Sequence, residues 1–162
     1  MIVPAGYRLV ELTETASTNS DCLNAARNGD LGHLWIVAAR QSAGRGSRGR
    51  QWESQSGNLY CSLLLIDPGP ARSLANLTFV AALAVHDAIA EFARAAGIAR
   101  DVALKWPNDV LIEGRKASGI LLENHTIDGR SAVITGIGVN CASHPPGARH
   151  PATDLAEQGI DA

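Results

Sequence analysis

Arginine and glycine alternate over one short segment, Gly44-Arg45-Gly46-Ser47-Arg48-Gly49-Arg50. Glycine lets a backbone approach a ligand closely and adopt positive φ angles, and the exposed N–H groups of such a loop form a concavity for anions. Arginine adds charge-assisted, often bidentate, hydrogen bonds to phosphate or carboxylate oxygens. The segment therefore predicts a site for a phosphate-bearing anion. A solvated, disordered loop and an RNA-binding loop are the alternatives, and the low aromatic content of 4% disfavours stacking of RNA bases.

A second group of polar residues surrounds a proline, in the segment Lys105-Trp106-Pro107-Asn108-Asp109. Proline fits poorly inside a sheet, so this segment marks a strand end or bulge where side chains are re-aimed. Asn108 and Asp109 at such a break can hold a divalent cation, since Mg²⁺ uses one or two carboxylates together with phosphate oxygens. Lys116 opens the next expected strand and can reach a phosphate. Each of these residues is commonplace alone, as a turn or a surface lysine.

Two further segments are unusual for the elements in which they are expected. Ser17-Thr18-Asn19 precedes a helix, where it can act as an N-cap or present polar groups and free N–H groups to a ligand. Gly136-Ile137-Gly138-Val139-Asn140 alternates glycine with β-branched residues. Glycine weakens a strand unless something must approach its backbone closely, so a close contact is expected here.

The elements that position these residues follow from the hydrophobic pattern. Strands are expected at residues 9–12, 35–39, 59–66, 102–106, 109–112, 116–123 and 132–139, and helices at 19–27 and 74–92. Ser17 or Thr18 is expected to cap the first helix and Ser73 the second. Strands outnumber helices and several are joined by tight turns, so we predict an α+β fold with a mixed, largely antiparallel sheet packed by helices. From Ala142 onward the pattern predicts no element.

The composition is that of one ordinary soluble domain. The chain has 162 residues, 46% hydrophobic and 19% charged, and a net charge of −2, which demands neither nucleic acid nor an anionic membrane. No signal peptide and no run of about 18 apolar residues is present. Cys22, Cys61 and Cys141 form no Cys-x-x-Cys pair, which predicts structural thiols in a reducing cytoplasm. A metal site at Cys141, His144 and His150 is disfavoured, because a fourth ligand is missing.

Taken together, five motifs resemble the catalytic domain of biotin protein ligases (biotin–acetyl-CoA-carboxylase ligases) of the biotin/lipoate protein ligase superfamily. They lie in the family's order and spacing over about residues 10 to 141: Ser17-Thr18-Asn19, Gln41-Ser42-Ala43-Gly44-Arg45-Gly46 with Gly49-Arg50 and Trp52, Lys105-Trp106-Pro107-Asn108-Asp109, Gly114-Arg115-Lys116 with Gly119-Ile120-Leu121, and Gly136-Ile137-Gly138-Val139-Asn140. The resemblance implies a catalytic fold like that of class II aminoacyl-tRNA synthetases and biotin ligases. We expect one catalytic domain over residues 1–162, without the helix-turn-helix of repressor-type members and without the small C-terminal β domain.

The activity that the resemblance implies has two steps. The carboxylate of biotin attacks the α-phosphate of ATP, with Mg²⁺, and a lysine amine of a biotin carboxyl carrier domain then attacks the biotinyl-adenylate. No protein nucleophile is required, and we expect a cytoplasmic enzyme with no DNA or membrane partner, for which a monomer and a homodimer are both open. The alternatives are a lipoate or octanoate ligase, and a biotin- or nucleotide-binding domain without transfer activity.

The resemblance also assigns site residues. The biotin-binding set is Ser17, Thr18, Asn19, Gln41, Arg45, Gly46, Ser47, Lys116 and Gly119, and the ATP-binding set is Gly44, Arg45, Arg48, Gly49, Arg50, Trp52, Asn108 and Asn140. Lys116, Arg48 and Asp109 are the expected catalytic residues, and Asp109 either holds Mg²⁺ or steers the incoming amine. Ser47 stands where most relatives carry arginine, which predicts that activated biotin leaks from the site. Closure of the glycine-rich loop over the ligand is also expected.

Overall fold

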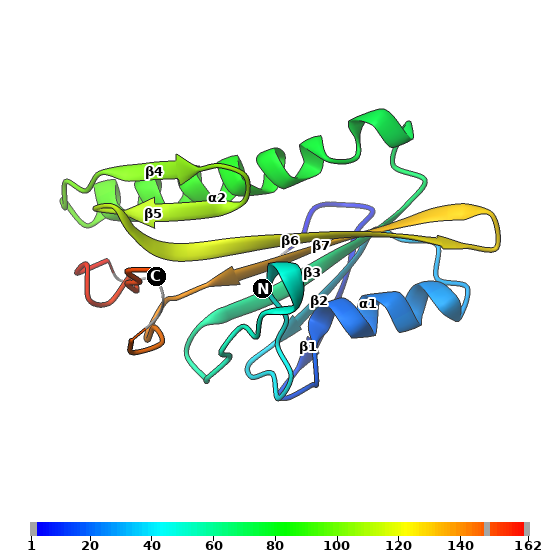
Figure 1. Ribbon diagram of the computed structural model, residues 1–162, viewed down its shortest axis with the longest axis horizontal. Coiled ribbons are helices and arrows are strands. Elements are labelled where there is room, and N and C mark those ends of the chain that lie inside the picture. Colours follow the sequence, from blue (N-terminus) through cyan, green and yellow to red (C-terminus); the bar gives the residue numbers. More distant parts are fainter. Residues whose placement is uncertain (1–2, 148–149, 161–162) are drawn as a thin grey trace.

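A seven-stranded sheet with strand order β1-β2-β3-β7-β6-β5-β4 forms the body of the computed structural model, which describes residues 3–147 and 150–160 (Figure 1). Only β1 and β2 pair in parallel, and every other neighbouring pair is antiparallel. The predicted α+β fold with a mixed, largely antiparallel sheet is therefore confirmed. The elements are β1 (Arg8–Leu12), α1 (Thr18–Arg27), β2 (Leu34–Ala38), β3 (Leu59–Ile66), α2 (Asn76–Ala95), β4 (Val102–Lys105), β5 (Asp109–Ile112), β6 (Arg115–Ile127) and β7 (Arg130–Val139).

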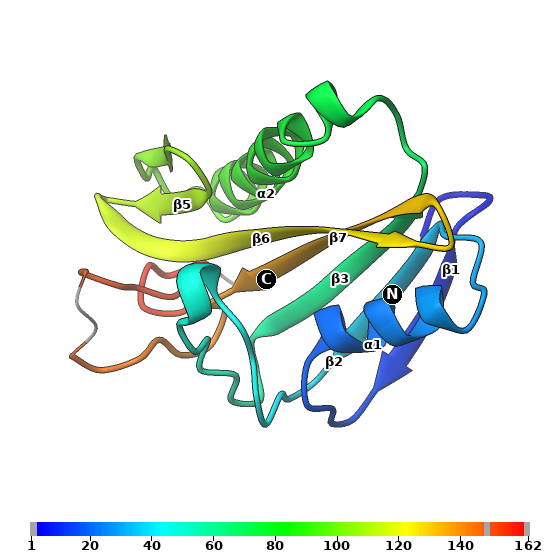
Figure 2. The same ribbon diagram turned by 45° about the vertical axis from the view of Figure 1, so that its right-hand side comes forward.

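The two helices cover opposite faces of the sheet (Figures 1 and 2). α1 packs on β2, β3 and β7, where Leu64 and Ile134 are fully buried in one apolar cluster. α2 packs mainly on β4, β5 and β6, where Ile89 and Ile120 belong to a second cluster. Successive residues of a strand point to opposite faces, so β7 contributes Ile134 to the first cluster and Val139 to the second. The face of β6 and β7 toward α1 carries the candidate site.

The start of α2 differs from the prediction. Ser73 does not cap this helix, because it lies in a short 3₁₀ turn, Ala71–Ser73, and its hydroxyl donates to the carbonyl of Pro70 at 2.9 Å. The helix begins three residues later, at Asn76.

By length and composition the stretch Ala71–Ala95, which contains α2, could cross a membrane, but one such helix is weak evidence. Its inner face carries alanines and Ile89 into the core.

The segment after Ala142 is more ordered than the sequence indicated. Ala152 forms a parallel bridge with Lys116, whose N–H donates to the carbonyl of Pro151 at 2.8 Å. Leu155 and Ile160 are buried in the cluster beneath α2. As the sequence pattern predicts, residues 151–160 belong to no helix or strand, but specific bonds hold them in place. Its proline-, glycine- and alanine-rich composition gives no periodic pattern, and its order depends on pairing with a distant strand.

The cysteines behave as structural thiols. Cys22 and Cys61 are buried, and desolvation raises the pKa of each to about 12. A thiol that stays protonated at neutral pH is a poor nucleophile and metal ligand. Among residues 3–147 and 150–160, no group of potential metal ligands joins Cys141 to His144. His144 instead pairs with Asp154 at 2.6 Å and lies 3.9 Å from Glu157.

Candidate ligand-binding site

The side chain of Gln41 caps the start of α1. Its side-chain oxygen Oε1 accepts from the backbone N–H of Thr18 at 2.9 Å and lies 3.2 Å from the Thr18 hydroxyl. Its amide nitrogen donates to the Ser54 hydroxyl at 2.9 Å. Ser17 is the residue before the helix but makes no side-chain capping bond, so the predicted cap is replaced by a residue from the loop after β2. Ser17 and Thr18 are each 3% exposed, and the helix start is thus part of a closed polar pocket.

Three polar residues from three elements form a hydrogen-bonded network beneath this pocket, and of the three only Asn19 is in its lining. The hydroxyl of Ser62, on β3, lies 2.7 Å from that of Thr18 and 2.6 Å from Asn19 Oδ1. Asn19 Nδ2 donates to Glu123 Oε2, on β6, at 2.7 Å. Sequence analysis missed Ser62 and Glu123. A signal was available for Ser62, since it is the one hydroxyl in the apolar strand Leu59–Ile66 apart from the tyrosine. Glu123 shows no signal except a spacing of four from Gly119, which places both on one strand face.

Glycines let side chains lie flat on the sheet. A Cβ at Gly136 would overlap the Asn19 amide, and a Cβ at Gly138 would lie 2.6 Å from Cε2 and Nε1 of the Trp52 indole. Gly119 pairs directly with Gly138 and is also covered by Trp52, whose Cζ3 would meet a Cβ there at 3.0 Å. The expected close approach to the alternating glycines is confirmed. The approaching groups are side chains of this chain.

Lys116 has a carboxylate and an aromatic ring beside it. Its Nζ lies 2.6 Å from Asp109 Oδ1 and 5.2 Å from the centre of the Trp52 ring. The Lys116 and Asp109 side chains are only 23% and 18% exposed, so the pair is largely sheltered from water. Asn108 uses its amide nitrogen to bind the carbonyl of Ile120 at 2.7 Å. After Pro107, Asp109 thus faces Lys116, while Asn108 is bound to the backbone of β6.

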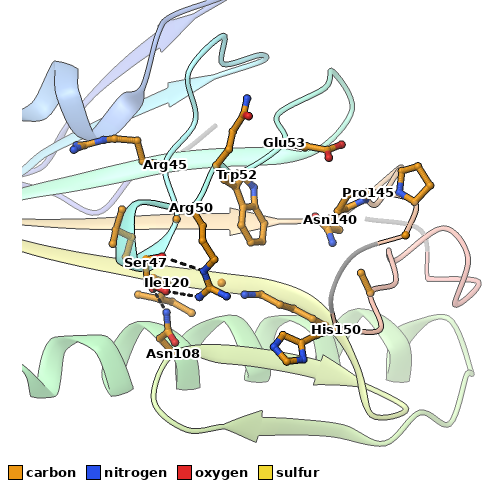
Figure 3. A pocket seen from close by; sticks show the side chains of 18 residues that line it. Arg45, Ser47, Arg50, Trp52, Glu53, Asn108, Ile120, Asn140, Pro145 and His150 are labelled. Atoms are coloured by element: carbon orange, nitrogen blue, oxygen red, sulfur yellow. Dashed lines mark hydrogen bonds between the residues drawn. The ribbon is translucent and has the colours of Figure 1, made fainter.

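The arginines of the loop point to different places. Arg45 Nη2 donates to Glu123 Oε2 at 2.8 Å, and Arg50 binds the carbonyl and hydroxyl of Ser47 at 3.1 and 2.7 Å. Arg48 has a left-handed backbone, φ 59°, and is exposed. In Figure 3, Arg45 points toward α1, whereas Arg50 reaches over the strands. The hydrogen bonds of Arg45 and Arg50 therefore hold the loop in place.

Two cavities lie on this face of the sheet. The larger, about 330 Å³, is shown in Figure 3, and its lining includes nine of the predicted residues: Arg45, Gly46, Ser47, Arg50, Trp52, Asn108, Lys116, Gly119 and Asn140. The smaller, about 30 Å³, is lined by seven of them: Ser17, Thr18, Asn19, Gln41, Arg45, Trp52 and Gly119. Because Arg45, Trp52 and Gly119 line both, the cavities adjoin along the indole.

Four predicted residues are not in the lining of either cavity. Gly44 packs tightly under the loop, where a Cβ would lie 2.5 Å from Ser54 Oγ. Asp109 reaches the larger cavity only through Lys116. Arg48 and Gly49 form the outer side of the loop and are exposed. Residues near the C-terminus, among them Pro146 and His150, line the larger cavity and were not predicted.

Comparison with known protein families shows to which family this chain belongs. The model of the biotin/lipoate A/B protein ligase family matches residues 6–140. The chain belongs to this family. It is 45% identical over 155 residues to the biotin–[acetyl-CoA-carboxylase] ligase of Paracoccus denitrificans, covering 91% of this chain and 63% of that protein. It is 40% identical over 142 residues to the bifunctional ligase/repressor BirA of Bacillus subtilis, covering 86% and 42%.

Solved structures of biotin protein ligases share the fold. The enzyme of Leishmania major in complex with biotinyl-5-AMP superposes with a TM-score of 0.80 at 30% identity, covering 99% of this chain and 68% of that one. The Aquifex aeolicus enzyme in complex with biotin and ATP gives a TM-score of 0.75 at 34% identity, covering 96% and 62%. The chain therefore spans about two thirds of the length of these relatives and less than half of the Bacillus protein.

Proposed function

We propose that this chain adenylates biotin with ATP and transfers the biotinyl group to a lysine of a biotin carboxyl carrier domain. One observation carries the proposal. The buried polar pocket at the start of α1 adjoins a larger cavity that holds Lys116 and Arg50, and the two share Arg45, Trp52, Gly119 and Leu121 in their linings. A ligand with a polar ring at one end and a carboxylate at the other fits this arrangement, with its ring in the polar pocket and its carboxylate in the larger cavity. The two neighbouring structures contain such ligands.

The smaller cavity would take the ureido ring. Thr18 and Asn19 offer a hydroxyl and an amide, and Gln41 adds a second amide, all on neutral side chains. Such groups suit a ring that both donates and accepts hydrogen bonds, whereas the aliphatic dithiolane of lipoate has no donor for the oxygen lone pairs that these groups leave free. A volume of about 30 Å³ holds little more than a water molecule. Ring entry therefore requires Arg45 or Trp52 to withdraw.

In the larger cavity, Lys116 would bridge the biotin carboxylate and the α-phosphate. Its Nζ, held by Asp109 at 2.6 Å, supplies a positive charge where both reacting groups are negative. Arg50 and the backbone of the loop would cover the phosphates, and Trp52 and Asn140 would line the adenosine side. The acceleration would come from positioning and charge stabilisation, because the biotin carboxylate itself is the nucleophile. Arg48 would take part only after the loop has rearranged.

The residues around Asp109 fit a magnesium site poorly. Its carboxylate already faces the ammonium group of Lys116, and the one group of three potential metal ligands found among the described residues is His144, Asp154 and Glu157. Mg²⁺ commonly binds through substrate phosphates with few protein ligands, so the ion would arrive with ATP. We therefore favour Asp109 as the residue that holds Lys116, or later steers the carrier amine, over Asp109 as a metal ligand.

The test is to mix the purified chain with biotin, ATP, Mg²⁺ and a carrier domain, and to follow pyrophosphate release and the mass of the carrier. The expected result is both pyrophosphate and a carrier heavier by one biotinyl group. Pyrophosphate without a mass gain would reduce the proposal to the first step, and neither product would favour a binding domain. Lipoate in place of biotin is the matched control. Faster turnover with lipoate would reverse the substrate assignment.

A further inference from the structure

Glu123 is the carboxylate that two residues of the smaller cavity share. Asn19 Nδ2 and Arg45 Nη2 both donate to its Oε2, at 2.7 and 2.8 Å. The three residues come from α1, the glycine-rich loop and β6, so separate elements meet at one oxygen atom. The Glu123 side chain is 21% exposed, and Asn19 is almost completely buried. The carboxylate therefore lies behind the lining of the smaller cavity, where it holds two of the lining residues.

A carboxylate can only accept hydrogen bonds, and this fixes the direction of the bonds around it. Asn19 must turn Nδ2 toward Glu123 and Oδ1 toward Ser62. Because Oδ1 is also only an acceptor, the single proton of the buried Ser62 hydroxyl is committed to it, across 2.6 Å. The Thr18 hydroxyl then gives its proton to Ser62 or Gln41, at 2.7 or 3.2 Å. The Thr18 oxygen is left as an acceptor for a ligand N–H.

Two further contacts support this arrangement. The Asn19 amide lies so close to the backbone of β7 that a Cβ at Gly136 would overlap it. The amide is thus fixed from below by a glycine and at its nitrogen by Glu123. On the other side, the ion pair ties Arg45 to the sheet and turns its side chain toward α1 (Figure 3). Arg45 lines both cavities, so its position affects how they connect.

We infer that Glu123 is a positioning residue, which orients Asn19 and Thr18 to accept the N–H groups of the ligand ring and holds Arg45 over the smaller cavity. This inference rests on the proposed function and concerns its ligand specificity. Glu123 itself need not touch the ligand. A ligand head without N–H donors would gain nothing from the arrangement.

The experiment compares Glu123→Gln, Glu123→Ala and Gly136→Ala with a control, Glu91→Gln. Glu91 lies on α2 with its side chain 75% exposed, and its contact to Arg94 is 4.0 Å long. Calorimetry gives the Kd of biotin and, separately, of ATP. We expect Glu123→Ala to weaken biotin about tenfold or more, since a buried amide donor loses its partner, while the Kd of ATP changes less than about twofold. Glu123→Gln keeps an acceptor and should lose less.

Trypsin cleavage at the loop arginines separates the two roles of Glu123. Both Glu123 variants should be cleaved about two- to fivefold faster without ligand, the range expected for losing a partly exposed ion pair. Gly136→Ala should weaken biotin binding without faster cleavage, because it displaces Asn19 and leaves the Arg45–Glu123 pair in place. Glu91→Gln should match the native chain in both assays.

The inference is overturned if biotin and ATP weaken equally in the Glu123 variants, as a general structural defect would cause, or if neither weakens. It is also overturned if loop cleavage is unchanged. A native chain that forms no biotinyl-adenylate refutes the proposed function instead, and the cleavage assay still decides whether Glu123 holds Arg45.

Discussion

Adding one methyl group to Gly138 should displace Trp52 and slow adenylation strongly. A Cβ at this position would lie 2.6 Å from Cε2 and Nε1 of the indole and 2.9 Å from Cζ2. Favourable contacts between carbon atoms begin near 3.5 Å, so the ring must withdraw by about 1 Å. At Gly119 the added Cβ would lie 3.0 Å from Cζ3 and 3.1 Å from Lys116 Nζ, and a withdrawal of about 0.5 Å by the ring and by the flexible lysine end is enough. The ring also lies 5.2 Å from Lys116 Nζ, so its movement disturbs the charge that the reaction uses.

A misplacement of 1 Å can cost about a hundredfold in rate. We therefore expect the rate of pyrophosphate release to fall about a hundredfold in Gly138→Ala and clearly less in Gly119→Ala, with circular dichroism unchanged in both. Trp52→Phe in the Gly138→Ala background removes the clashing atoms and should recover part of the loss. Equal rates in the native chain and Gly138→Ala, or a larger loss in Gly119→Ala, would refute the packing argument.

Three further predictions follow from other contacts. Asp109→Asn removes the charge 2.6 Å from Lys116 Nζ, and since a hydrogen bond between charged groups contributes about 1.5–3 kcal/mol, the rate of adenylation should fall about 10- to 100-fold with little change in the Kd of biotin; an unchanged rate would contradict this role. Ser47→Arg should reduce the release of free biotinyl-adenylate, measured by chromatography, and equal release would exclude leakage through this position. Cys22 and Cys61 should resist thiol reagents at pH 8 in the folded chain. Because their pKa is raised from about 9 to about 12, the unfolded chain loses these protons first, and the free energy of unfolding should fall as pH rises from 9 to 12; denaturant titrations that show no fall would contradict the burial.

Most of the sheet could be predicted from the sequence, because its strands carry a local signal. The predicted strand 59–66 coincides with β3 (Leu59–Ile66), and the predicted strand 109–112 coincides with β5 (Asp109–Ile112). The start of α2 could not be predicted, since Ser73 suits a 3₁₀ turn as well as a helix cap and only the chain geometry after Pro70 decides between them. The order of residues 151–160 depends on contacts with Lys116 and Asn140, which no local pattern reveals.

For the site, the residue types were predicted better than their contacts. The sequence indicated that Lys116 and the arginines bind an anion, and the structure brings Lys116, Arg45 and Arg50 to one cavity. It did not indicate Glu123, because one glutamate in a long strand looks like an ordinary solvated residue. Its importance depends on Asn19, more than a hundred positions earlier, and on the loop. Long-range pairing of this kind has no local signature.

The alternating glycines of β7 make room for two side chains of this chain. From the sequence, Gly136 and Gly138 predicted a close contact with the backbone of β7 but not the group that makes it. In the structure, Asn19 and Trp52 occupy those places, one at each glycine. The two glycines point to the same face because they are two residues apart, so the polar amide and the aromatic ring lie side by side. This spacing helps to bring the smaller cavity next to the larger one, so the proposed ligand could engage both.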